Sequence, residues 1–193
     1  MNLKLVLPSF ALILFLFLIF KKEEVYEPQI FKGNIMGTTY NIILQSDVSA
    51  EDAHIEAYNI LQKVNLEMST YIDDSLISKV NKADIGQWVT VSQDFLDVLS
   101  FATTLCKDTQ GIYDVSIGKL VNLWGFGPDS VDKQPSTEEL SYFSSQVGCN
   151  SIETDPTNLS IKKAKDVELD FSSIAKGFAL DKVYEFLIKQ SYL

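Results

Sequence analysis

Apolar residues along this chain follow two periods, which predict a mixture of strands and helices. Apolar–polar alternation indicates short strands, and apolar residues three or four positions apart indicate amphipathic helices. The predicted strands cover residues 31–44, in two pieces around Gly37, and residues 87–91, 149–153, 158–162 and 167–171. The predicted helices have apolar faces within residues 53–64, 95–106 and 178–187. Because strands and helices do not alternate regularly, we expect an α+β fold in which helices pack on a mixed sheet.

Serine and acidic residues mark where these helices should begin, because their side chains accept hydrogen bonds from free backbone N–H groups. The expected start positions are Ser49 with Asp52, Asp74 with Ser75, Ser92, and Ser136 with Glu139. Gly111 should stop the helix that Ser92 starts, and the helix after Ser136 should end near Gly148. The last helix is predicted over residues 175–189, and Asp155 with Pro156 should form the turn of a hairpin.

The N-terminal stretch, residues 3–20, is apolar except for Lys4 and is long enough to span a bilayer. A signal peptide is the alternative, but no small-residue cleavage site follows this stretch. We therefore favour an uncleaved membrane anchor over residues 1–22, a polar tether over residues 23–29 and one folded domain over residues 30–193.

The composition excludes several functions for that domain. The net charge of −10 disfavours binding to nucleic acid or anionic lipid. His54 is the only histidine, which argues against a histidine-based metal centre or triad within the chain. Without any arginine, lysine must supply every cationic contact to a phosphate. Cys106, expected to be buried, and Cys149 lie far apart and form no CxxC motif, so the sequence leaves a disulfide between them open.

A glycine-rich stretch at residues 111–128, GIYDVSIGKLVNLWGFGP, is the first candidate for ligand binding. Glycine serves where the backbone adopts positive φ or approaches a ligand closely. Asp114 stands in an apolar run, where a carboxylate without a partner would be costly to bury. We predict a loop, a short helix and a second loop around a flat ligand with polar edges. The alternative is a glycine-rich connection in which Trp124 and Phe126 plug the core.

A second stretch at residues 169–182, LDFSSIAKGFALDK, is suited to a phosphate. The predicted strand ends here, Ser172 is a candidate N-cap, and Lys176 and Gly177 fall in the first turn of the last helix. Free N–H groups at a helix start favour an anion, and a lysine adds positive charge. An ordinary strand-to-helix turn is the alternative.

These two stretches, together with MGTTY at 36–40 and MSTYIDDSLISKVN at 68–81, closely resemble the ApbE family, the FAD:protein FMN transferases. The resemblance covers residues 30–193 and implies an ApbE-like fold that stops before the family's C-terminal part. It implies that FAD is bound by Met36, Tyr71, Ile112, Tyr113, Asp114, Asp170 and Lys176, and that Ser173 gives one oxygen to Mg²⁺. Met36 and Tyr71 offer surfaces for rings, the aspartates can accept hydrogen bonds from ribose or adenine, and Lys176 can meet the pyrophosphate.

The reaction implied by the resemblance transfers FMN from FAD to a Thr or Ser hydroxyl of a target protein, with Mg²⁺, and releases AMP. It also implies the outer side of the bacterial inner membrane and acceptors among membrane redox-complex subunits. In relatives the remaining Mg²⁺ ligands and the catalytic residues lie beyond the position of Leu193, so we expect this chain alone to transfer no FMN. A fragment of a longer product, and a flavin-binding protein without transferase activity, remain the alternatives.

Overall fold

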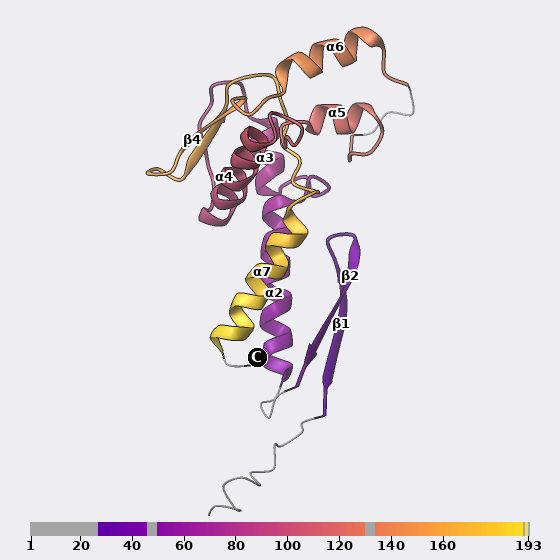
Figure 1. Ribbon diagram of the computed structural model, residues 1–193, viewed down its shortest axis with the longest axis vertical. Helices are drawn as coiled ribbons and strands as arrows, with labels where there is room; N and C mark the ends of the chain where they lie inside the picture. Colours follow the sequence, from indigo (N-terminus) through magenta and orange to yellow (C-terminus); the bar gives the residue numbers. More distant parts are fainter. Residues whose placement is uncertain (1–26, 46–49, 130–133, 191, 193) are drawn as a thin grey trace, which may run out of the picture.

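The computed structural model describes residues 27–45, 50–129, 134–190 and 192. In chain order they form β1 (Gln29–Ile35), β2 (Thr38–Leu44), α2 (Ala50–Met68), α3 (Leu76–Lys82), β3 (Val89–Thr90), α4 (Gln93–Asp108), α5 (Gly118–Leu123), α6 (Thr137–Gln146), β4 (Ile152–Asp155), β5 (Ser160–Lys163) and α7 (Ala175–Lys189). Figure 1 shows α2 and α7 side by side, the β1–β2 hairpin beside α2, and most other elements gathered at one end. The α+β class is confirmed.

Two small antiparallel sheets account for the named strands. β1 pairs with β2, and β5 lies between β3 and β4. The two strands predicted around Gly37 and the hairpin predicted around Asp155 are confirmed, although β4 and β5 begin slightly later than expected. Asp155 closes the second hairpin, because its Oδ1 accepts the backbone N–H groups of Thr157 and Asn158, each at 3.1 Å.

His54 attaches the first hairpin to α2. Its ring stacks on Phe31 of β1 with centroids 4.8 Å apart, and its Nε2 lies 2.9 Å from the Tyr40 hydroxyl of β2. The histidine thus has polar and aromatic partners within the fold.

The core lies where α2, α4 and α7 meet the segment before α7. Small residues, Ala53 and Ala57 on α2 and Ala175 and Ala179 on α7, are all buried and allow these two helices to approach closely. The aromatic centre of this core is Phe95 against Phe171, both fully buried, with ring centroids 5.0 Å apart. Burial of these side chains is the main stabilising contribution to the fold.

The predicted helix starts are borne out at three of the positions. The Oγ of Ser92 accepts the Phe95 N–H at 3.0 Å, Ser75 caps α3, and Ser136 with Glu139 forms a capping box on α6. The start predicted at Ser49 lies outside the described residues. α4 ends at Asp108, and Gly111 stops it as expected: its φ is 84° and its N–H donates to the Cys106 carbonyl at 2.8 Å.

The strand predicted over residues 167–171 is wrong, although the alternation behind it is correct. Val167, Leu169 and Phe171 are all buried, as the pattern required. The segment nevertheless has no neighbouring strand along its length and makes only an isolated parallel bridge between Glu168 and Ile117. Its backbone N–H and C=O groups form hydrogen bonds with a loop and with a side chain instead. Alternation indicates which side chains are buried, but it does not require a neighbouring strand.

The N-cap predicted at Ser172 is also wrong. Residues 172–174 form a turn, α7 begins at Ala175, and Ile174 occupies the N-cap position without a side-chain cap. The reason is Asp170, whose Oδ1 accepts the Ser172 N–H at 2.6 Å and so places Ser172 inside a turn. Lys176 and Gly177 still fall in the first turn of α7, as predicted.

A disulfide joins Cys106, at the end of α4, to Cys149, in the loop before β4. Their Cα atoms lie 5.6 Å apart, 43 residues apart in the sequence. The question that the sequence left open is thus answered, and Cys106 is buried as expected.

The predicted membrane anchor lies outside the described residues. Within the ranges that the structure describes, no helix combines the length and the hydropathy needed to cross a membrane.

Candidate functional site

A cavity of about 550 Å³ opens between the β1–β2 turn, the C-terminal end of α2 and the start of α7. Its volume lies within the range of small-molecule sites. Three residues expected to bind the ligand, Met36, Tyr71 and Lys176, line this cavity, although they come from three separate segments of the chain. The other lining residues are Gly37, Asn65, Met68, Ser69, Thr70, Ile72, Ser172 and Ala175.

Met36 reaches the cavity through a strained turn. It has a φ of 52° and Gly37 a φ of 69°, so both central residues of the β1–β2 hairpin adopt the left-handed conformation that a type I′ turn requires. Glycine does this without cost, but methionine does not. Strain of this kind persists where the surroundings fix it, and it is concentrated at ligand sites.

Tyr71 connects two loops at the cavity. Its hydroxyl donates to the Phe126 carbonyl at 2.8 Å, while the side chain stays 66% exposed. The ring is therefore held in place with a face available for stacking. Trp124 and Phe126 are exposed too, so the alternative in which they plug the core is wrong. The loop, short helix α5 and second loop predicted for this stretch are confirmed.

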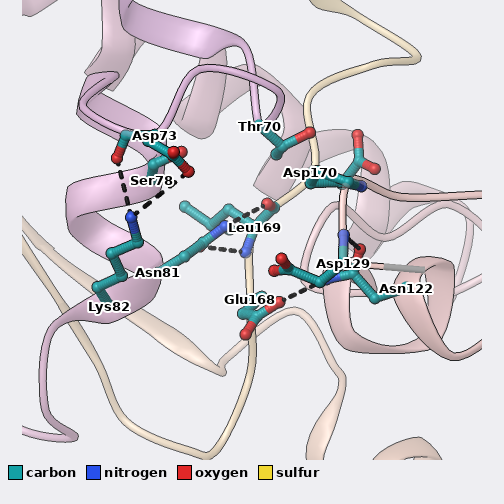
Figure 2. Close-up of a pocket in the computed structure, with 12 residues that line it drawn as sticks. Thr70, Asp73, Ser78, Asn81, Lys82, Asn122, Asp129, Glu168, Leu169 and Asp170 are labelled. Atoms are coloured by element: carbon teal, nitrogen blue, oxygen red, sulfur yellow. Dashed lines mark hydrogen bonds and ion pairs between the residues drawn. The ribbon is translucent and has the colours of Figure 1, made fainter. Parts of the chain in front are cut away.

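A second, smaller cavity of about 160 Å³ is polar and shares Thr70 with the first. Figure 2 shows Asp170, Glu168 and Asn122 around it. The Asp170 N–H donates to the Val115 carbonyl at 2.8 Å. Asp170 thus faces the polar cavity from the segment that leads into α7, next to the cavity that Lys176 lines.

Glu168 is a half-buried acid of this second cavity. Burial raises its pKa above the ordinary value, although Lys119 and Lys163 act in the opposite direction. Asn122 donates to its Oε2 at 3.1 Å. A carboxyl group that is kept from water beside a polar cavity can donate a hydrogen bond when it is protonated.

The remaining predicted residues lie elsewhere. The Tyr113 hydroxyl is 3.1 Å from the Ser173 Oγ, which joins the glycine-rich stretch to the turn before α7. Ile112 is 91% exposed and lines neither of the two cavities. Asp114 does not line them either, and its Oδ1 accepts the N–H and the hydroxyl of Ser116 at 2.8 and 2.7 Å.

A magnesium site is not complete among these residues. In the parts of the chain that the structure describes, no three His, Cys, Asp or Glu side chains group closely enough to hold a metal ion. Ser173, the expected oxygen donor, bonds to Tyr113 through its hydroxyl. Since Mg²⁺ requires near-octahedral oxygen ligation, the described residues do not by themselves fit this ion.

A family model described as the ApbE family matches residues 36–192, which is most of the chain. The chain belongs to the ApbE family. Among curated relatives, it is 42% identical over 164 residues to an FAD:protein FMN transferase of Haemophilus influenzae, covering 80% of this chain and 47% of that protein. It is 37% identical over 172 residues to the FAD:protein FMN transferase of Vibrio cholerae, covering 87% of this chain and 51% of that protein.

Solved ApbE structures share the fold. The apo form of the Pseudomonas stutzeri flavinyl transferase ApbE superposes with a TM-score of 0.80 at 30% identity, over 86% of this chain and 56% of that one. The flavin transferase ApbE from Vibrio cholerae gives a TM-score of 0.80 at 35% identity, over 86% and 54%. The chain thus spans about half the length of the curated relatives that it matches.

The sequence analysis missed two polar residues beside the candidate site, Asn81 and Glu168. Both line the smaller cavity. Asn81 lies within the stretch at 68–81 that resembles the family, but its partner is 88 residues away. The signal for Glu168 was its position between two buried residues, which placed it opposite the core.

Proposed function

We propose that this chain binds FAD and belongs to an enzyme that transfers FMN from FAD to a Thr or Ser hydroxyl of a target protein. The relatives named FAD:protein FMN transferase support the reaction class. The observation that carries the proposal is the larger cavity, where Met36, Tyr71 and Lys176 meet from separate segments. Its volume of about 550 Å³ suits a flavin-sized group.

The proposed contacts divide according to chemistry. Lys176 and the free N–H groups of the first turn of α7 attract the pyrophosphate, because positive charge and the helix dipole act in the same place. Met36 and the exposed ring of Tyr71 contact flat aromatic surface. Asp170, in the adjoining polar cavity, accepts hydrogen bonds from ribose hydroxyls or the adenine amine.

In the proposed reaction, the acceptor oxygen bonds to the FMN-side phosphorus while the bond from that phosphorus to the bridging oxygen breaks. The hydroxyl proton is released, and AMP leaves with the bridging oxygen. We also propose that the transfer requires Mg²⁺, to which Ser173 would give one oxygen. The described residues do not supply the other ligands, so the contribution we assign to this chain is binding and orientation of FAD.

A flavin-binding protein without transferase activity is the second candidate. It is favoured by one observation: among the described residues, no three His, Cys, Asp or Glu side chains group closely enough to hold a metal ion. To separate the two functions, FAD, Mg²⁺ and a threonine peptide are incubated with this chain alone and with this chain extended by the C-terminal part that the relatives have. A covalent fluorescent band on a denaturing gel with the extended chain indicates transfer, whereas FAD uptake without such a band in either form indicates binding alone.

For location, we propose that residues 3–20 anchor the chain in the bacterial inner membrane with the domain on the periplasmic side, near acceptor subunits of membrane redox complexes. The Cys106–Cys149 disulfide supports an oxidising compartment. Extraction of membranes with alkaline carbonate should leave the chain in the pellet. A soluble species that begins near Lys22 would instead establish a cleaved signal peptide.

Replacing Lys176 tests the phosphate contact. Lys176→Ala should weaken FAD binding by about 1.5–3 kcal/mol, roughly ten- to a hundredfold, because a charge-assisted hydrogen bond is lost. Lys189→Ala is the matched control, since it removes the same charge from the last turn of the same helix. Calorimetric titration should show the loss for Lys176 only. Equal losses in both variants would mean that the general field of α7 matters and no specific contact exists.

A further inference from the structure

Asn81 makes two hydrogen bonds to the backbone of one distant residue. Its Nδ2 donates to the Leu169 carbonyl at 2.9 Å, and its Oδ1 accepts the Leu169 N–H at 2.7 Å. Figure 2 shows both bonds next to the polar cavity. The same pair of backbone groups would be bonded by a neighbouring strand in a sheet. Asn81 therefore stands in the place of a strand neighbour.

The other edge of the segment is held by the glycine-rich stretch. The Gly118 N–H donates to the Glu168 carbonyl at 2.8 Å, and the Asp170 N–H donates to the Val115 carbonyl at 2.8 Å. In an extended chain, backbone groups of successive residues point to opposite edges, so residues 168 and 170 bond on one side and residue 169 on the other. The Asn81 side chain completes this alternation.

This arrangement determines the direction of Asp170. Leu169 is fully buried, and side chains alternate between the two faces of an extended segment. When Leu169 is held with its side chain in the core, Asp170 is directed to the opposite face, where the polar cavity lies. A rotation of this segment would exchange the two faces.

Asn81 is itself fixed by a buried lysine. It lies in the last turn of α3, where carbonyl groups have no intrahelical partner. Lys163 of β5 is 6% exposed, and its Nζ donates to the Asn81 carbonyl at 2.6 Å. This bond fixes the end of α3 against the second sheet, and with it the origin of the Asn81 side chain.

We propose that Asn81 is a positioning residue that holds the segment around Leu169 so that Asp170 faces the polar cavity. Its relevance to FAD rests on the proposed function, because Asp170 is one of the proposed FAD contacts. A role in overall stability alone is the competing explanation, and the two differ in where the effect of a substitution appears.

The test compares Asn81→Ala with Asn59→Ala in the full chain, kept in detergent. Asn59 is an exposed asparagine of α2, and its Nδ2 donates a long hydrogen bond of 3.4 Å to Glu56 on the same helix. Amide hydrogen exchange is measured for Leu169 and for Phe95, a core residue of α4. In Asn81→Ala, exchange at Leu169 should accelerate about tenfold or more while Phe95 stays protected, because only the two hydrogen bonds between Asn81 and Leu169 are lost. Equal acceleration at both positions, or none at Leu169, would overturn the proposal.

The second measurement is FAD affinity, with and without Asp170→Ala. Asn81→Ala should weaken binding about tenfold in the parent chain and leave it nearly unchanged when Asp170 is already alanine, because coupled residues are not additive. An equal loss in both backgrounds would show a general structural effect. If the parent chain takes up no FAD, the proposed function fails, and hydrogen exchange alone decides whether Asn81 positions the segment.

Asn81→Asp is the second variant, for use if the alanine variant does not fold. It keeps the oxygen that accepts the Leu169 N–H and replaces the amide that donates to the Leu169 carbonyl. Protection of the Leu169 amide from hydrogen exchange should then remain higher than when both Asn81 bonds are lost, while FAD affinity falls. Wild-type affinity in this variant, with Asp170 present, would contradict the proposal.

Discussion

Reduction of the Cys106–Cys149 disulfide should strongly destabilise the domain. The bond connects the end of α4 to the loop before β4, and 43 residues separate its two ends. That interval contains the glycine-rich stretch, α5 and α6, so reduction releases a large part of the chain in the unfolded state. Because reduction removes no side chain, it tests the cross-link without creating a cavity.

The magnitude follows from the length of the closed loop. For a separation of 43 residues, the chain-entropy relation gives about 13 cal/mol/K, or about 4 kcal/mol at 25 °C. For a domain of this size, each kcal/mol corresponds to about 2–4 °C in melting temperature, so reduction should lower Tm by about 8–16 °C.

Thermal unfolding followed by circular dichroism, with and without a phosphine reductant, measures this effect. Thiol titration under denaturing conditions should give no free thiol before reduction and two afterwards. The control is the double variant Cys106→Ala/Cys149→Ala, whose Tm should not respond to the reductant. The reasoning would be refuted by a Tm that stays the same although both thiols have been shown to be free.

Two further predictions concern a buried acid and the aromatic core. Because burial raises the pKa of Glu168, the folded state holds its proton more tightly than the unfolded chain, so wild-type stability should fall as pH rises above the ordinary value of 4.5. Glu168→Gln should reduce the dependence of the free energy of unfolding on pH in this range, as measured by urea unfolding. The same pH dependence in both proteins would show that Glu168 does not contribute to it. Phe95→Ala should lower the free energy of unfolding by about 3–5 kcal/mol, because a fully buried ring that packs on Phe171 is lost. A loss below about 1 kcal/mol in the same assay would contradict this packing.

The elements whose signals are local could be predicted from the sequence. The start of α4 follows from a hydrogen bond between the Ser92 side chain and a backbone N–H three residues later. The capping box of α6 joins residues with the same spacing. The β1–β2 hairpin and the limits of α7 follow from alternation and helical spacing. Met36, Tyr71 and Lys176 could be expected at one site because their motifs resemble a family, and the structure brings them to one cavity.

The part that could not be predicted depends on contacts between distant segments. The cysteines of the disulfide are 43 residues apart, with no spacing motif to pair them. The partner of Asp114 within the fold is Ser116, two residues later, whose backbone N–H and hydroxyl both donate to the Asp114 Oδ1. The Ser116 Oγ also accepts the N–H of Gly148, next to the disulfide. A tight turn of this type gives no periodic signal.

The strand predicted over residues 167–171 does not form, and this has a specific physical cause. Alternation requires only that one face be buried and that the backbone groups find partners, and a sheet is the commonest way to meet both conditions. Here the Asn81 side chain supplies the partners on one edge and the glycine-rich stretch supplies them on the other. A second strand in place of Asn81 would cover the edge next to the polar cavity, whereas a single side chain leaves room for it. The departure from a regular sheet therefore occurs beside the cavity that Asp170 lines. This agrees with the FAD contact proposed for Asp170, because local rules are broken mainly at functional sites.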